Sequence, residues 1–205
     1  KTLFPYTTLF RSVSMKSLRL LLCALPLALT GCSTLSAVNW SAAYPWNWFG
    51  SSAAVSEQGV GGLTGSTALN EQAIGDALGS DYRLRSGMKT QNGGVVHYFE
   101  ALRGDKLALV INGDSGTVGR IDVLDSDIAA AGGVKVGTKF SDVYDKAFGN
   151  CQAATGDESN VVECKAKDSS HLSYQFSGNW QGPQGLMPPD DTLKNWTLSK
   201  IIWRR

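Results

Sequence analysis

Histidine is scarce in this sequence, since His97 and His171 are the only two among 205 residues. Neither lies at ligand spacing from the other or from a cysteine, which argues against a histidine-based metal centre. The sequence also lacks a Gly-x-Ser-x-Gly elbow, a glycine-rich phosphate loop with lysine and a His-Glu-x-x-His motif. We therefore predict no catalytic residue, no metal and no cofactor from motifs.

Acidic clusters that could hold a cation are equally sparse. Asp122, Asp125 and Asp127 form one spaced run after an expected strand. The run lacks the glycine and the distal glutamate of an EF-hand loop. We therefore interpret these aspartates as turn-capping residues and not as calcium ligands.

The chain has no excess of either charge, with 19 basic and 18 acidic residues. Removing residues 1–31 takes away Lys1, Arg11, Lys16 and Arg19 and no acid, which leaves 15 basic residues against 18 acidic ones. Nucleic acids and anionic membranes are bound by clustered lysine and arginine. The net charge therefore gives no reason to expect a nucleic-acid partner or an anionic membrane surface.

No apolar run reaches the length of about 20 residues that a membrane-spanning helix needs. The longest, from residue 20 to about residue 29, follows Met15 and the basic Lys16 and Arg19, as in a signal peptide. Residues 1–14 show no helical or strand period and precede this complete signal. We expect residues 1–14 to be a non-native leader and residues 15–31 to be the signal peptide.

The end of this signal matches the lipobox of bacterial lipoproteins in the four residues Leu29–Cys32. Cleavage is predicted between Gly31 and Cys32, and the Cys32 thiol is the nucleophile that takes up diacylglycerol. Ser33 follows in place of the aspartate that favours retention in the inner membrane. The sequence therefore predicts an outer-membrane lipoprotein that faces the periplasm. Several acyl chains would hold such a protein stably in the membrane.

Residues 32–56 have the composition of a tether, apart from a dense group of aromatic residues. The group comprises Trp40, Tyr44, Trp46, Trp48 and Phe49. These rings could lie among lipid headgroups, where indole is favoured, or they could fold back and cover an apolar edge of the domain. The second interpretation is favoured because Pro45 and the spacing suit an irregular, wrapped strand.

Residues 57–205 alternate between helical and strand periods and predict a single α+β domain, mainly one antiparallel sheet with about two helices. The first helix is expected from a Thr67 cap to Leu78, and the second from a Thr138 cap to the terminator Gly149. Asp190 or Asp191 is expected to cap a further short segment. Strands are expected at residues 82–88, 95–102, 106–112, 117–124, 161–166, 171–176 and 196–203.

Four cysteines are present, and the sequence predicts different fates for them. Cys23 leaves with the signal peptide and Cys32 is lipidated, which leaves Cys151 and Cys164. Two thiols in an oxidising periplasm are expected to form a structural disulfide. A redox role would need a Cys-x-x-Cys motif, which the sequence lacks.

Several segments, in order, resemble the RpoE-regulated lipoproteins of Gram-negative bacteria. They are MKSLRLLLCALPLALTGCSTLS (15–36), VNWS (38–41), PWNWFGS (45–51), VSEQGV (55–60), DYRLRSGMKT (81–90), RIDVLDSDI (120–128), KAFGNC (146–151) and SKIIWRR (199–205). The resemblance implies an envelope lipoprotein whose gene answers the sigma-E stress response. Cys32 matches the lipidation site of that family, and no catalytic residue is implied.

Two functions follow from these observations. The first is a non-catalytic interaction or envelope-stress accessory protein, held to the membrane through lipid on Cys32, that binds an envelope protein or glycan. The second is an envelope hydrolase with an unfamiliar site. Such an enzyme would need a cleft that gathers acidic residues with perturbed pKa values.

Overall fold

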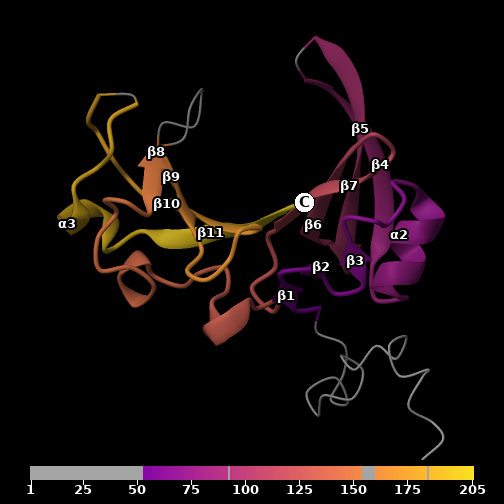
Figure 1. Ribbon diagram of the computed structural model, residues 1–205, viewed down its shortest axis with the longest axis horizontal. Coiled ribbons are helices and arrows are strands. Elements are labelled where there is room, and N and C mark those ends of the chain that lie inside the picture. Colours follow the sequence, from indigo (N-terminus) through magenta and orange to yellow (C-terminus); the bar gives the residue numbers. More distant parts are fainter. Residues whose placement is uncertain (1–52, 92, 154–159, 184) are drawn as a thin grey trace, which may run out of the picture. The chain divides into compact units, whose positions relative to one another are not determined.

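The computed structural model describes residues 53–91, 93–153, 160–183 and 185–205 (Figure 1). The chain divides into units 1–49 and 50–205, and the fold below is that of the second unit. The predicted leader, signal peptide, cleavage and lipidation sites and the aromatic cluster lie outside the described residues. Within the described ranges, no helix is long and apolar enough to cross a membrane.

The fold is built mainly from strands. The strands are β1 (Val55–Ser56), β2 (Gly59–Val60), β3 (Leu63–Thr64), β4 (Arg83–Gln91), β5 (Gly94–Arg103), β6 (Lys106–Asp114), β7 (Thr117–Val123), β8 (Cys151–Ala153), β9 (Val161–Lys165), β10 (Leu172–Ser177) and β11 (Thr197–Arg204). The helices are α2 (Glu71–Leu78), α3 (Asp190–Leu193) and the 3-10 turns η5 (Ala131–Gly133) and η6 (Phe140–Asp142). The predicted α+β class is confirmed.

Eight strands form one antiparallel sheet in the order β4-β5-β6-β7-β11-β10-β9-β8. Short turns connect β4 to β7 into a meander, whereas the last strand of the chain, β11, pairs with both β7 and β10. Figure 1 shows β4–β7 on one side of β11 and β8–β10 on the other. The C-terminal strand therefore joins the two halves of the sheet.

Alternation along the strands places apolar side chains on one face of this sheet. Ile121 and Val123 on β7 and Ile201 and Trp203 on β11 are all buried there. Under the β8–β11 half, the rings of Phe140, Tyr144 and Phe176 lie with centroids 5.2 to 6.0 Å apart. The core is therefore continuous beneath both halves of the sheet.

The first predicted helix begins later than the sequence indicated. Asn70, not Thr67, is the N-cap, because its side chain accepts a hydrogen bond from the Ala73 amide at 2.8 Å. The preceding backbone is paired elsewhere, since the Val118 amide donates to the Thr67 carbonyl and the Leu69 amide donates to Gly116. Tertiary pairing with the β6–β7 turn therefore removes residues 67–69 from the helix.

The second predicted helix, residues 138–149, is wrong, since the segment contains only the 3-10 turn η6 and further turns. Its start is paired with the C-terminal strand: the Phe140 amide donates to the Trp196 carbonyl at 2.8 Å and the Leu198 amide donates to Thr138 at 2.8 Å. Backbone groups used in this pairing cannot close helical turns. The second α-helix is instead α3, in a different segment.

The predicted cap of α3 is also wrong. Pro189 occupies the N-cap position, and Asp190 and Asp191 lie in the first turn. The Asp190 carboxylate instead accepts a hydrogen bond from the distant Ala147 amide at 2.8 Å. This contact ties α3 to the turn that ends near Gly149.

A small three-stranded sheet, β1-β2-β3, was not predicted. It begins at Val55, which is buried and whose amide donates to the Ala129 carbonyl at 2.9 Å. The indole of Trp203 donates to the Glu57 carbonyl at 3.0 Å. The packed region thus includes Val55 and Ser56, which the sequence assigned to the end of the tether.

Candidate functional site

The second face of the large sheet, opposite the apolar core, carries polar side chains. Strand partners in direct register share a face, so Lys165, Ser173, Ile202 and Asp122 form one row across β9, β10, β11 and β7. We call this side of strands β4–β11 the polar face. On β10 even its serine and glutamine side chains, Ser173 and Gln175, are buried.

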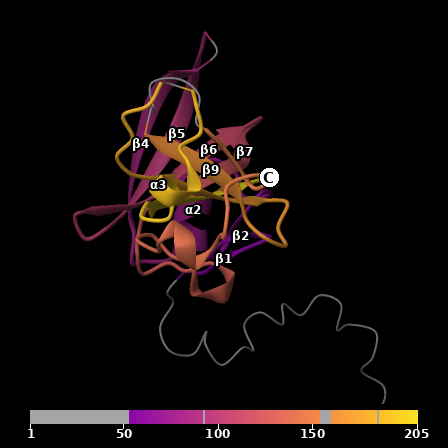
Figure 2. The same cartoon turned by 90° about the vertical axis from the view of Figure 1, so that its left-hand side faces the viewer.

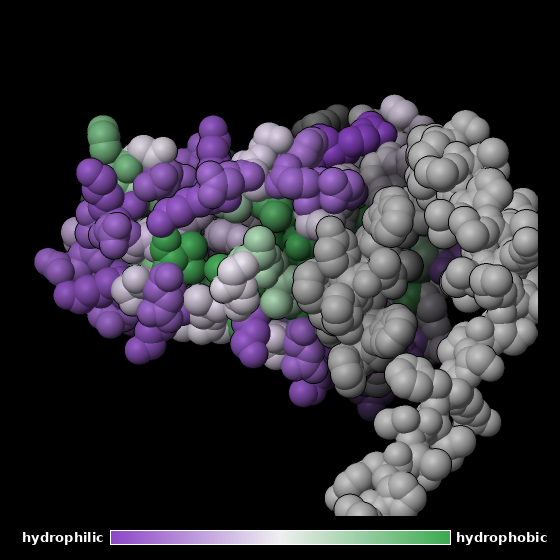
Figure 3. Space-filling model, turned by 60° about the horizontal axis from the view of Figure 1, so that its bottom comes forward, coloured by the Kyte–Doolittle hydropathy of each residue, from purple (hydrophilic) through white to green (hydrophobic). Residues whose placement is uncertain are grey.

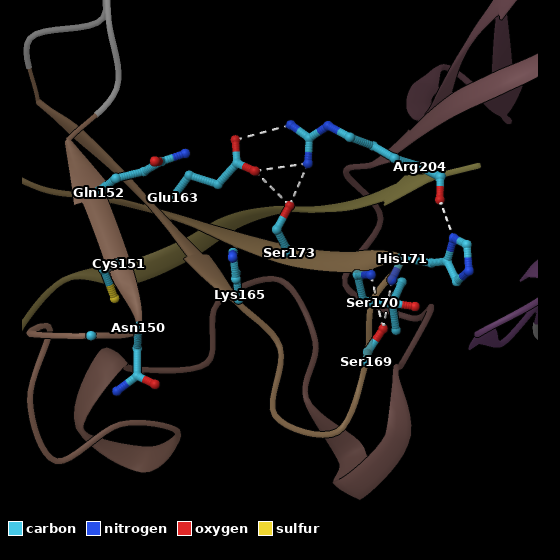
Figure 4. Close-up of a pocket in the computed structure, with 12 residues that line it drawn as sticks. Asn150, Cys151, Gln152, Glu163, Lys165, Ser169, Ser170, His171, Ser173 and Arg204 are labelled. Carbon is cyan, nitrogen blue, oxygen red and sulfur yellow. Dashed lines mark hydrogen bonds and ion pairs between the residues drawn. The ribbon is translucent and has the colours of Figure 1, made fainter.

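A pocket of about 560 Å³ opens at the β8–β10 end of this face. Figure 4 shows its lining side chains, which come from β8 and the turn before it, from β9, from β10 and the loop before it, and from the end of β11. The polar groups among them include Gln152, Glu163, Lys165, His171 and Arg204. Because donors and acceptors converge here, this pocket is the candidate functional site.

A triangle of hydrogen bonds holds the acid of the pocket in place. The Arg204 guanidinium donates to both oxygens of Glu163, at 2.7 and 3.0 Å, and to the Ser173 hydroxyl at 2.6 Å. The Ser173 hydroxyl in turn donates to Glu163 at 2.7 Å. A bidentate arginine–carboxylate contact fixes the orientation of the carboxylate as well as pairing its charge. The Glu163 side chain is therefore held in one orientation.

The same contacts set the ionisation of Glu163. Partial burial by itself would raise the pKa of this carboxyl group, but hydrogen bonds from Arg204 and Ser173 and the charges of Arg204 and Arg120 lower it. The net result is a pKa below the ordinary glutamate value. Glu163 is therefore an ionised hydrogen-bond acceptor at neutral pH.

One of the two histidines lies in this pocket. His171 Nδ1 lies 2.8 Å from the Arg204 carbonyl oxygen, and its ring stacks on Trp203 with centroids 6.3 Å apart. The Ser169 hydroxyl accepts hydrogen bonds from the amides of His171 and Leu172. The other histidine, His97, is exposed on β5.

The two cysteines expected to pair are joined in the structure. Cys151 on β8 and Cys164 on β9 are direct register partners, and their sulfur atoms are 2.06 Å apart. Cys164 is fully buried in the core, whereas Cys151 also lines the pocket. The bond therefore ties the three-residue edge strand β8, which forms one wall of the candidate site, to the rest of the sheet.

The aspartate run takes part in ion pairs with arginine. Asp122 is bound by Arg120 at 2.6 Å, while Asp125 and Asp127 lie 3.0 and 3.6 Å from Arg103. Asp125 also accepts a hydrogen bond from the Asp127 amide at 2.9 Å, as a turn-capping aspartate does. No group of three or more potential metal-binding side chains occurs among the described residues.

A second pocket, of about 430 Å³, is more apolar and lies on the core side. Val55, Val134, Val143, Leu172 and Tyr174 are among its lining residues. Figure 3 brings forward the side on which β1 and the 3-10 turns lie, and it shows apolar residues between hydrophilic rims. Its lining also includes Glu57, Asp142, Lys167 and Asp168. Because its exposed surface is nevertheless mainly apolar, this pocket is the weaker candidate for a polar ligand.

The polar face is strongly charged, although the chain is not. Its side chains on strands β4–β11 are seven basic and three acidic ones: Arg83, Arg85, Lys89, Arg120, Lys165, Lys200 and Arg204 against Glu100, Asp122 and Glu163. The sequence after residue 31 has 15 basic and 18 acidic residues. Eight basic and fifteen acidic residues therefore lie outside the polar face. The fold therefore separates charges that the net value hides.

Sequence reasoning did not find the Glu163–Ser173–Arg204 triangle. Its members are 10 to 41 positions apart and form no motif. The one signal was the alternation of His171, Ser173 and Gln175 with apolar residues in an expected strand. That pattern indicates a polar side of the sheet, but it does not reveal which distant charges meet there.

The fold and the site define an α+β sheet domain with a polar pocket at one end of its non-core face. Residues 37–205 match the family described as "Protein of unknown function (DUF1131)", and the chain belongs to that family. It is 73% identical over 191 residues to "Uncharacterized protein YfeY" of Escherichia coli K12, covering 93% of this chain and 100% of the relative. Lipidation and stress regulation, which the sequence resemblance implied, stay predictions.

A solved structure is also similar. The crystal structure of the uncharacterized protein yfeY from Escherichia coli matches with a TM-score of 0.66 and 70% identity, covering 74% of this chain and 99% of the solved chain. About three quarters of this sequence thus corresponds to a whole crystallised chain. The crystallised relative is therefore a folded chain of about that length.

Proposed function

We propose that this protein is a lipid-anchored protein of the bacterial outer membrane whose folded domain is a non-catalytic binding module. The lipobox Leu29–Cys32 and the preceding signal support the anchor. The paired Cys151 and Cys164 support an oxidising compartment, where structural disulfides persist. The binding site of the module is the pocket beside Glu163.

The observation that carries the binding role is the lowered pKa of Glu163 within its triangle with Arg204 and Ser173. General acid–base catalysis needs a group whose pKa lies near the working pH. An acid held ionised below its usual pKa is a poor proton donor and a weak base, but it stays a fixed, charged group toward which a ligand can orient its donors. The geometry therefore favours binding over proton transfer.

The pocket chemistry fits a polyhydroxylated ligand, that is, a glycan of the envelope. Amide, hydroxyl and ammonium groups of Asn150, Gln152, Ser170 and Lys165 line the same pocket as the fixed acceptor Glu163. Hydroxyl groups of a sugar can both donate to a carboxylate and accept from amides and ammonium groups. An envelope protein with exposed polar side chains is the other partner class.

Pocket binding is tested with peptidoglycan sacculi and a piece covering residues 53–205. We expect the piece to sediment with sacculi, and we expect Gln152→Ala with Lys165→Ala to weaken this by roughly tenfold, since each lost hydrogen bond to a ligand costs about 0.5–1.5 kcal/mol. Lys139→Ala, at an exposed site outside the pocket, is the matched control. Equal sedimentation of both variants would refute the glycan site.

Photo-crosslinking in living cells tests the other partner class. A crosslinker at position 152 should capture a protein if an envelope protein occupies the pocket, whereas one at position 139 should not. Capture at both positions alike would argue against a pocket-specific partner.

A hydrolase remains the second proposal because of His171. Its ring is oriented by the Arg204 carbonyl through Nδ1, as catalytic histidines often are through one ring nitrogen. If the pocket hydrolyses a bond, His171→Ala should abolish turnover of ester or amide probes while the domain stays folded. A turnover that survives this substitution would exclude His171 as the base.

A further inference from the structure

The β4–β5 hairpin extends beyond the rest of the large sheet. β4 and β5 pair as far as Gln91 and Gly94, whereas the pairing of β5 with β6 begins only at Tyr98. Residues 88–91 and 93–97 thus form a two-stranded ribbon without a third strand. Figures 1 and 2 both show this end of the hairpin standing out from the sheet.

The ribbon exposes apolar side chains on one of its faces. Met88 is 66% exposed and Val95 is 68% exposed, and both lie on the side that covers the core further down the hairpin. Large apolar side chains so exposed are costly in water and mark a contact site when they come together. No described element packs on them to explain their presence.

The other face of the same hairpin is cationic. Arg83, Arg85 and Lys89 lie on β4, and the sequence from residue 83 to residue 99 contains no acidic residue. Lys89 Nζ lies 5.7 Å from the centre of the Tyr98 ring and donates to Asn112 at 2.6 Å. Arg85 is paired with Glu100 at the base of the hairpin.

Gly87 on β4 lies directly opposite Tyr98 on β5. A side chain at Gly87 would collide with the Tyr98 ring, whose nearest atom would lie 2.4 Å from its Cβ. Glycine therefore lets the ring cross β4 and brace the ribbon. The hairpin is a supported element with one apolar and one basic face.

We propose that the β4–β5 hairpin is a docking element for an anionic phospholipid surface. Met88 and Val95 enter the boundary between headgroups and acyl chains, while Lys89, which lies two positions before the end of β4 at the turn, contacts the phosphate groups. Basic residues near an anionic bilayer attract it additively, and the excess of seven basic over three acidic side chains on the polar face strengthens the field. A projecting tip can reach a flat surface without help from the rest of the domain.

Lipid is favoured over a soluble anion because charge alone would not require the exposed apolar pair. It is favoured over an acidic protein because the apolar pair lies on the two-stranded part of the hairpin, where no third strand adds surface to complete a protein interface of usual size. The inference is independent of lipid on Cys32. Its test uses residues 53–205 without lipid. A negative result would therefore not bear on the proposed lipid anchor at Cys32 or on the proposed binding pocket beside Glu163.

The experiment is co-sedimentation of residues 53–205 with vesicles of phosphatidylglycerol and phosphatidylethanolamine, compared with vesicles of phosphatidylcholine alone. We expect binding to the anionic vesicles that falls as salt is added. Lys89→Gln should weaken it about fivefold, the effect of one charge near the surface. Met88→Ser with Val95→Ser should weaken it roughly tenfold or more.

Matched controls lie elsewhere on the surface. Leu186 is 59% exposed and Lys146 is exposed, and neither belongs to the hairpin, so Leu186→Ser and Lys146→Gln should leave binding unchanged. A second measurement uses the variants Val95→Trp and Leu186→Trp as fluorescent probes. Brominated lipid should quench the fluorescence of the Val95→Trp variant more than that of the Leu186→Trp variant. This readout does not depend on the strength of binding in the serine variants.

Three results would overturn the proposal. One is the absence of binding to anionic vesicles. Another is binding that the hairpin variants and the control variants change equally. The third is binding to dextran sulfate, a soluble polyanion, that is as tight as binding to anionic vesicles and depends on Lys89 but not on Met88 and Val95.

Discussion

Deleting the C-terminal strand should abolish cooperative folding of the domain. β11 is the last element in the chain but lies at the middle of the eight-stranded sheet, between β7 and β10. Ending the chain before Trp196 removes both ladders and separates β4–β7 from β8–β10. The two halves would then share no strand.

The magnitude follows from the side chains that would be lost. Five large apolar residues of this segment are at most 3% exposed: Trp196, Leu198, Ile201, Ile202 and Trp203. Burial of such a side chain contributes about 1.5–3 kcal/mol, so the five contribute roughly 7–15 kcal/mol. This loss is as large as the whole net stability of a typical domain, about 5–15 kcal/mol.

Circular dichroism at increasing temperature measures the effect on residues 53–205. We expect the full piece to unfold in one transition and the truncated piece to show none. Ile201→Val, which removes one methylene group, should cost only about 0.5–1.5 kcal/mol and keep the transition. A truncated piece that melts cooperatively, for example because β7 and β10 pair directly, would refute the reasoning.

Reduction of the Cys151–Cys164 disulfide should lower the free energy of unfolding by about 3 kcal/mol in the chain-entropy model. Urea unfolding with and without reductant measures this difference. In a piece with both cysteines replaced by alanine, the reductant should leave the free energy of unfolding unchanged. Cys32→Ala should leave unprocessed precursor and stop fatty-acid labelling; continued labelling would contradict the lipobox prediction. The ionised Glu163 stabilises the fold above the pKa of the unfolded carboxyl group, and this contribution is lost as pH falls through its lowered folded pKa. Glu163→Gln should therefore destabilise the domain at about pH 7 but much less at about pH 3 in urea unfolding, and an equal effect at both pH values would show that the Arg204 pair does not set this acid's ionisation.

The sequence predicted most of the strands because their information is local. Apolar residues at every second position and glycine-containing turns marked the β4–β7 meander and the β9–β10 and β11 strands closely. The pairing of Cys151 with Cys164 was predictable by elimination, since only these two cysteines follow Cys32. Neither inference needed knowledge of which strands are neighbours.

Both helix errors arose where a backbone segment pairs with a distant strand. Thr67 and Thr138 each have the features of a helix cap, yet the first is paired with Val118 and the second with Leu198. Local propensity is worth a few tenths of a kcal/mol per residue, and tertiary hydrogen bonds and burial outweigh it. The residues next to Thr67 and Thr138 in the sequence do not indicate which distant strand each segment pairs with.

The sequence by itself determined the α+β class, the composition of the core and the identity of the cysteine pair, because periodicity and residue type are properties of neighbouring positions. Only the tertiary structure decided that β11 joins the two halves, that Arg204 meets Glu163 across 41 positions, and that basic side chains gather on one face. Strand order and register set these contacts. They depend on how distant segments pair to bury a common core, which net charge and local pattern do not encode.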